Sequence, residues 1–119
     1  MRTIELTKEH RGGGKSTSFS GRPEGQAVRI ALSIDKCDNE EGFFIIRIPP
    51  DTTSFNPSFF LGLFYDSVKK VGSVDKFKNK YKLDLSNFDN KELQSLIEQD
   101  FEDCYQRCNN ELNNLTGID

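Results

Sequence analysis

Segment 43–58 constrains the fold more than any other part of the chain. Its first half, 43–48, is apolar except for one arginine, which is typical of a strand covered on both faces of a parallel sheet. Two prolines and a hydroxyl-rich turn, 51–55, follow, and Asn56 and Pro57 are residue types that begin helices. A buried strand that leads through a turn into a helix is typical of α/β proteins. In such proteins, functional groups collect beyond the carboxyl ends of the strands.

The spacing of apolar side chains predicts the other elements. Alternation of apolar and polar residues predicts strands at 3–7 and 81–85, and the loop after the first strand could hold a further short strand at 17–20. Apolar residues spaced three and four apart predict three helices, which begin at Pro23, Pro57 and Asp89. We expect the first helix to end near Asp38 and the second to end at Gly72. The order β-β-α-β-α-β-α indicates an α/β fold with right-handed crossovers.

The chain of 119 residues is long enough for one domain that buries about two-thirds of the surface of the unfolded chain. Within 1–119 we expect 1–20 to supply the N-terminal strand and a loop rich in Gly and Ser. We expect 109–119 to form a polar tail that frays. The apolar stripes predict a core made of Ile30, Ile34, Phe44, Ile46, Phe60, Leu63, Phe64, Leu96, Ile97 and Phe101.

Composition and charge argue against several classes of function. The net charge is −3, whereas nucleic-acid-binding proteins usually carry a basic stripe. No apolar run approaches the length of about 20 residues that crosses a bilayer, and 1–10 lack the apolar centre of a signal peptide. Cys37, Cys104 and Cys108 have no disulfide or zinc-site spacing and suit buried positions in a reducing compartment. We therefore expect a cytoplasmic protein that binds neither nucleic acid nor membrane.

No motif in the chain predicts catalysis. Residues 12–17, Gly-Gly-Gly-Lys-Ser-Thr, end like a phosphate-binding loop, but Glu9 stands where that motif needs its first glycine. His10 is the only histidine, and no Gly-x-Ser-x-Gly turn or convergent pair of carboxylates accompanies it. We predict no enzymatic activity, no cofactor and no metal site.

Arg22, Gly25 and Arg29 form a first candidate site, for an anion. They lie at the start of a predicted helix, where the helix N-terminus and two guanidinium groups could act together. An ordinary turn with two surface arginines is an equal alternative for the same residues.

The turn 52–58 forms a second candidate site. Its hydroxyl groups lie next to a helix N-terminus, where an added phosphate would meet unpaired backbone N–H groups. Helix capping and turn formation are the simpler interpretation of the same residues. The hydroxyls belong to Thr52, Thr53, Ser54 and Ser58.

These segments resemble the pattern of a known family. Gly21-Arg22-x-x-Gly25-x-x-x-Arg29 leads into a helix, and an apolar strand and Ser54-Phe55-Asn56-Pro57-Ser58 follow it. This pattern is similar to that of the STAS-like family of small bacterial proteins. The resemblance covers most of the chain, about 21–105. It implies a single-domain STAS-like sandwich, with a four- or five-stranded mixed sheet and helices packed mainly on one face.

The resemblance also implies a function. STAS-like proteins are similar to the STAS domains of anti-sigma-factor antagonists, which implies a non-catalytic regulatory module that binds a protein partner. Such a partner is often a histidine-kinase-like ATPase that phosphorylates the module. Ser58 matches the family's Ser-Phe position, and Ser54 is the nearest alternative. The antagonists' Asp-Ser-Ser-Gly turn is absent, and the acidic residue after the strand is displaced to Asp51.

Two other functions stay open from the sequence. One is a small acidic inhibitor protein of phage or mobile-element origin, and the other is a domain that binds a phosphorylated small molecule. For the regulatory function we predict a partner-binding surface made of the turn 52–58 and the neighbouring loop 21–25. Phe55 has the alternative role of fixing the helix start to the core. The residues predicted for partner binding or phosphorylation are Ser58, Ser54, Thr53, Phe55 and Asn56.

Overall fold

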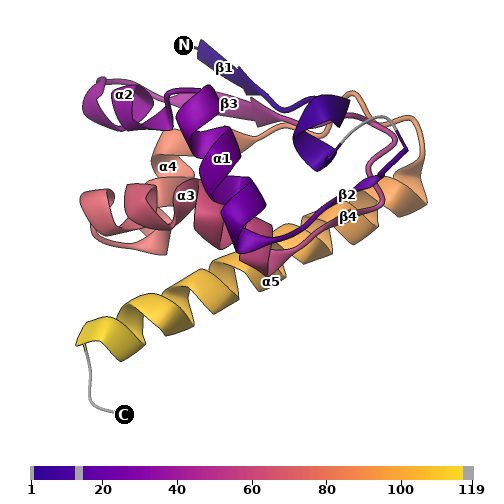
Figure 1. The fold of residues 1–119 in the computed structure, drawn as a ribbon. Coiled ribbons are helices and arrows are strands. Elements are labelled where there is room, and N and C mark those ends of the chain that lie inside the picture. The colour runs from indigo at the N-terminus through magenta and orange to yellow at the C-terminus, as the bar shows by residue number, and fades with distance from the viewer. Residues whose placement is uncertain (1, 13–14, 117–119) are drawn as a thin grey trace.

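The computed structural model describes residues 2–12 and 15–116, and Figure 1 shows their arrangement. The strands are β1 (Arg2–Glu5), β2 (Ser18–Phe19), β3 (Phe44–Arg47), β4 (Ser54–Phe55) and β5 (Tyr81–Leu83). The helices are the 3-10 helix η1 (Lys8–Arg11) and α1 (Arg22–Ala31), α2 (Ile34–Asn39), α3 (Pro57–Val71), α4 (Val74–Lys80) and α5 (Lys91–Thr116). Together they form one compact α/β domain. No helix among the described residues is long and apolar enough to cross a bilayer.

The strands form two separate parallel sheets instead of one mixed sheet. β1, β3 and β5 pair in the order β1-β3-β5, and β2 pairs with β4. Pro49 and Pro50 follow β3 closely, and because proline has no N–H to donate, the chain leaves the first sheet there. The α/β class is therefore confirmed, whereas the single four- or five-stranded mixed sheet is wrong.

The three-stranded sheet has one covered face and one open face. In β3, Phe44 and Ile46 are buried and Arg47 is exposed, and in β1 only Ile4 is buried. Figure 1 shows α1 and α3 on one side of β1 and β3. The prediction that this strand is covered on both faces is wrong, because Ile45 on the opposite face is only half-buried.

α1 packs against α3 where neither helix has a side chain. A Cβ atom on Gly25 would lie 2.2 Å from the carbonyl oxygen of Phe59. One on Gly62 would lie 2.1 Å from the carbonyl oxygen of Arg22. The close approach of the two backbones therefore requires both glycines. This contact holds the start of α1 beside the first turns of α3.

The same contact sets the orientation of α1. Gly25, Val28 and Arg29 face inward and are buried, whereas Ile30 is 79% exposed. The placement of Ile30 in the core is therefore wrong, because the glycine contact and the buried Arg29 occupy the inner side of the helix. The predicted helix also breaks at Ser33, whose φ of 54° is left-handed and cannot continue an α-helix. α2 begins at the next residue.

α3 begins and ends where the residue types predict. Asn56 occupies the N-cap position, Pro57 the first helical position, and Gly72 ends the helix with a φ of 104°.

The next helix, α4, is not predicted by the apolar periodicity. Its signal is local, because the Ser73 hydroxyl at its N-cap accepts a hydrogen bond of 3.1 Å from the N–H of Lys76.

The N-terminus of α5 is capped by Asn90 instead of the predicted Asp89. The side-chain oxygen of Asn90 accepts a hydrogen bond of 3.0 Å from the backbone N–H of Leu93. At the other end the helix includes 109–116, and residues 117–119 of the predicted polar tail lie outside the described residues.

The inner face of α5 differs at one position from the predicted core. Ile97, Phe101, Cys104 and Cys108 are buried, whereas Leu96 is 58% exposed. Successive side chains of a helix are rotated by about 100° around its axis. Because Ile97 faces the core, the side chain of Leu96 points toward solvent. The placement of Leu96 in the core is therefore wrong.

Aromatic side chains fill the space between α3, α4 and β5. The ring centres of Phe64 and Phe77 lie 5.0 Å apart, and those of Phe77 and Tyr81 lie 4.9 Å apart.

Cys37 is buried like the other two cysteines, and all three are free thiols. The remaining predicted core residues are confirmed as buried: Ile34, Phe44, Ile46, Phe60, Leu63, Phe64, Ile97 and Phe101.

Candidate functional site

Parallel pairing of β2 and β4 brings two hydroxyl-rich segments side by side. Ser18 lies opposite Ser54 in the ladder, and their hydroxyl oxygens are 2.6 Å apart. The hydroxyl oxygens of Thr17 and Thr53 are 2.7 Å apart, so each pair shares a hydrogen bond. We call these four side chains, together with Ser58, the hydroxyl row.

Ser58 extends the hydroxyl row onto the first turn of α3. Its hydroxyl oxygen accepts a hydrogen bond of 3.2 Å from the backbone N–H of Gly21. Gly21 has a φ of 93°, which glycine adopts without strain. The structure therefore brings together the turn 52–58 and the loop 21–25. The first turn of α3 has no acidic residue, so its N–H groups and the positive end of its dipole favour negative charge here.

Accessibility differs among the predicted site residues. Thr53 is exposed, whereas Ser54, Asn56 and Ser58 are half-buried. Asn56 stands at the N-cap of α3, but its side chain makes no capping hydrogen bond. Thr53 is therefore the most accessible hydroxyl of the predicted residues, and Ser58 is the one that lies on the helix.

Thr52 belongs to a buried contact below the turn. It is fully buried, and its hydroxyl accepts a hydrogen bond of 3.0 Å from the guanidinium of Arg11. Arg11 also donates to a carboxylate oxygen of Asp51 at 2.8 Å. This hydrogen bond holds the pKa of the Asp51 carboxyl below its usual range. Arg11 thus ties η1 to the turn.

Phe55 lies in the core instead of on the surface. Its ring is fully buried, with the centre 4.5 Å from that of Phe101 and 5.1 Å from that of Phe19. Its backbone N–H donates to the carboxylate of Asp100 in α5 at 2.9 Å. This burial supports the alternative interpretation of Phe55, in which it fixes the start of α3 to the core.

Arg22 is held by a carboxylate from the other end of the chain. Its guanidinium donates two hydrogen bonds, of 3.1 and 2.8 Å, to the two carboxylate oxygens of Glu111. These bonds raise the pKa of Arg22. The guanidinium carbon also lies 5.4 Å from the centre of the Tyr65 ring. Arg22 thus connects the start of α1 to α5.

Arg29 points into the interior. It donates to the carboxylates of Asp35 at 2.6 Å and Asp38 at 2.5 Å. It also donates to the Ser67 hydroxyl and to the carbonyl oxygen of Leu63, both at 2.8 Å. Each nitrogen of the guanidinium therefore has a protein acceptor. The structure does not bring Arg22 and Arg29 to a common anion site, and Gly25 between them serves helix packing.

The contacts of Arg29 belong to a polar network that the sequence analysis did not predict. Asp38 accepts hydrogen bonds from the Tyr81 hydroxyl at 2.5 Å and the Ser67 hydroxyl at 3.0 Å. Burial and the hydrogen bond to Asp38 raise the pKa of Tyr81 well above its usual range. The network links α1, α2, α3 and β5. Its signal in the sequence is Arg29 itself, four residues after Gly25 and so on the same helix face.

The segment that ends like a phosphate-binding loop connects η1 to β2. A phosphate-binding loop follows a buried strand, whereas this segment follows a 3-10 helix, and residues 13–14 lie outside the described residues. Within 2–12 and 15–116, the His, Cys, Asp and Glu side chains form no group of three that could hold a metal ion.

Comparison with known proteins gives no match. No family model matches the sequence, and no curated protein or solved structure matches it. The resemblance to the STAS-like family therefore stays a prediction, which rests on the residues quoted for it.

Proposed function

We propose that this chain is a non-catalytic regulatory module that binds a partner protein through the hydroxyl row. Phosphate on Ser58 would control that binding. The observation that carries the proposal is the position of the row, where hydroxyl groups from two distant segments meet at the start of α3. The STAS-like resemblance supports a histidine-kinase-like ATPase as the partner. A cytoplasmic location belongs to the same proposal, and the three free cysteines support it.

The surroundings of Ser58 favour a phosphate chemically. Ser58 occupies the second position of α3, at the positive end of the helix dipole, and its hydroxyl accepts the N–H of Gly21. Phosphorylation adds nearly two negative charges and three strong acceptor oxygens. A phosphate on Ser58 would therefore be stabilised by the module itself and would change the charge of the surface that the partner covers.

Further along α1, the helix that starts beside Ser58 carries exposed apolar side chains, which favours a protein partner over a small ligand. α1 starts beside Ser58 and leaves Ala27, Ile30 and Ala31 exposed along one side. These three residues are spaced three and four apart and therefore share a helix face. Exposed apolar side chains next to polar groups are typical of protein interfaces.

The geometry favours neither of the alternative functions at this site. A phosphorylated small molecule was expected to use Arg22 and Arg29, and both guanidinium groups are held by carboxylates. The alternative function as an acidic inhibitor protein is based on the net charge of −3. That charge gives no reason for the hydroxyl row to be the binding surface.

Affinity capture from the native host tests the proposal. We expect the unmodified protein and Ser58→Ala to retain the same partner and Ser58→Asp to retain much less of it. Ser86→Asp is the matched control, because Ser86 is an exposed serine in the loop between β5 and α5. Equal recovery with Ser58→Asp and Ser86→Asp would contradict the proposed control by phosphate.

A further inference from the structure

β5 is an edge strand with one free side. It ends the order β1-β3-β5, and its sheet partner among the described strands is β3. The N–H of Asp84 donates to the carbonyl oxygen of Ile46 in β3 at 3.0 Å. Because the backbone groups of successive residues in a strand point to opposite sides, the N–H and C=O of Leu83 point away from β3. Leu83 thus offers a donor and an acceptor at the sheet edge.

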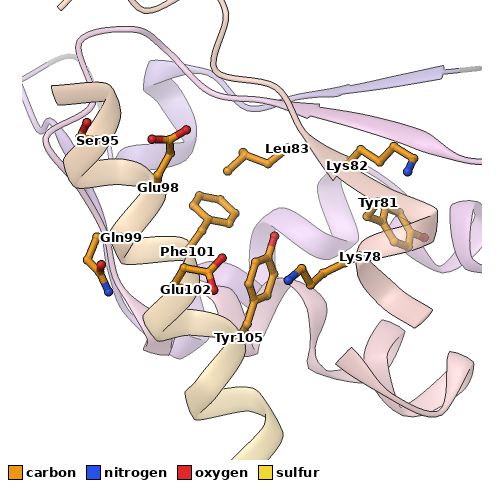
Figure 2. A pocket seen from close by; sticks show the side chains of 10 residues that line it. All are labelled: Lys78, Tyr81, Lys82, Leu83, Ser95, Glu98, Gln99, Phe101, Glu102 and Tyr105. Atoms are coloured by element: carbon orange, nitrogen blue, oxygen red, sulfur yellow. The ribbon is translucent and has the colours of Figure 1, made fainter. Parts of the chain in front are cut away.

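A groove of about 600 Å³ lies along this edge, between β5 and α5 (Figure 2). Leu83, Phe101 and Tyr105 supply its apolar and aromatic surface. Glu98 and Glu102, one helical turn apart on α5, line its other side. An open groove beside a free strand edge has the shape that fits an extended peptide.

The α5 side of the groove is acidic. Glu98 and Glu102 are both exposed, and neither forms an ion pair within the described part of the chain. The two lysines of the groove lie against aromatic rings instead. The ammonium of Lys78 is 4.9 Å from the centre of the Tyr105 ring, and that of Lys82 is 5.6 Å from the centre of the Phe43 ring. The two carboxylates therefore remain available to a basic ligand.

We propose that an extended basic segment of another protein binds in this groove as an added strand beside β5. Its backbone would pair with Leu83. Side chains of a strand alternate between two faces, so those that face α5 would be basic, with their charged ends against Glu98 and Glu102 and their aliphatic stems against Phe101. The segment would thus carry Arg or Lys at alternate positions. This site uses β5 and α5 and does not depend on the hydroxyl row.

The groove suits another protein better than a second copy of this chain. Lys82 is the central residue of β5, so antiparallel pairing of two β5 strands would bring two lysines together. A lysine in a short edge strand opposes self-association in this way. A basic segment, by contrast, is complementary to the carboxylates of α5.

Fluorescence anisotropy with short labelled peptides tests the proposal on the full chain. The probe is a synthetic peptide that alternates valine and arginine, and we expect saturable one-to-one binding. The same peptide with glutamate in place of arginine should not bind. A version with N-methyl groups on alternate backbone nitrogens should also fail, because it cannot pair with a strand edge.

Variants of α5 locate the site. The double variant Glu98→Gln/Glu102→Gln should weaken binding of the arginine peptide by about tenfold, as expected for the loss of two charge pairs. Glu92→Gln is the matched control, because Glu92 is an exposed glutamate of α5 outside the groove lining. It should leave binding unchanged.

Several results would overturn the proposal. These are the absence of saturable binding at millimolar peptide, equal binding of the N-methylated peptide, and equal effects of Glu92→Gln and the double variant. Sedimentation velocity tests whether a second copy of this chain occupies the groove instead of the basic segment. We expect a monomer both with and without the peptide. A dimer that the arginine peptide dissociates would assign the groove to a second copy instead.

Discussion

The guanidinium of Arg29 and the carboxylate of Asp38 lie 2.5 Å apart, with side chains that are 8% and 2% exposed. Hydrogen bonds from Ser67 and Tyr81 to the same carboxylate make this pair the centre of a network that links α1, α2, α3 and β5. Removal of one partner from a buried charge pair is strongly destabilising, because the other charge stays buried without full compensation.

Removal of Asp38 should therefore be costly. We expect Asp38→Ala to lower the free energy of unfolding by about 3–5 kcal/mol, because it removes the buried partner of Arg29 and the acceptor of the Ser67 and Tyr81 hydroxyls. Asp35→Ala is the matched control: Asp35 also pairs with Arg29, but its side chain is 86% exposed. Its loss should cost about 0–1 kcal/mol. Urea denaturation measures both, and equal losses would refute a special role for the buried pair.

The glycine contact between α1 and α3 leads to a second prediction. Gly62→Ala places a Cβ atom 2.1 Å from the carbonyl oxygen of Arg22, so the helices must separate. We expect a loss of about 1–3 kcal/mol or more, as for an overpacked core. Ser95→Ala, at an exposed position of α5, should change stability by less than about 0.5 kcal/mol. Thermal denaturation that shows the same midpoint for both variants would contradict the contact.

His10 supplies a pH-dependent test. Its Nδ1 accepts the N–H of Thr7 at 2.9 Å, and partial burial lowers its pKa below 6.5, a change that Glu9 only partly opposes. Between the lowered pKa and 6.5 the unfolded chain binds more protons than the native protein. The stability from this group is therefore complete above about pH 6.5 and is lost as the pH falls through the lowered pKa.

Proton NMR measures this pKa directly, because the chain has one histidine and its ring signals need no assignment. We expect a titration midpoint below 6.5 in the native protein and a midpoint of about 6.5 in urea. A native midpoint at or above the unfolded one would show that the ring is solvated and not held by Thr7.

The three cysteines should be unreactive in the native protein. Burial raises the pKa of all three thiols, that of Cys108 to about 11, so few thiolates form near pH 8. We expect no rapid reaction with an aromatic disulfide reagent until the protein unfolds, and then reaction of three thiols. Rapid labelling of one thiol in the native state would contradict its burial.

Elements with local signals could be predicted from the sequence. Asn56, Pro57 and Gly72 mark the ends of α3 by their own conformational preferences, and the structure confirms both ends. The exposure of Ile30 could not be predicted, because it depends on the contact of Gly25 with Gly62, which lies 37 residues further along the chain. Periodicity within one helix carries no information about which neighbour it meets.

The candidate site could likewise be predicted only in part from the sequence. The hydroxyl residues of the turn 52–58 and their place before a helix follow from the sequence. Their pairing with Thr17 and Ser18 does not, because β2 and β4 have two residues each, too few for alternation to show. The buried acceptors of Arg29 are likewise invisible in the sequence, since they come from α2 and α3.

The most direct test of the proposed regulation is the dissociation constant of the purified partner for three variants. Ser58→Glu should raise it at least about tenfold, since a charge at this position opposes a partner that covers the hydroxyl row. Ser58→Ala should stay within about twofold of the unmodified protein, and so should the control Ser86→Glu, at an exposed serine outside the row. If Ser58→Glu binds the partner as tightly as Ser86→Glu does, Ser58 is only a helix-start residue and the proposed regulation is wrong.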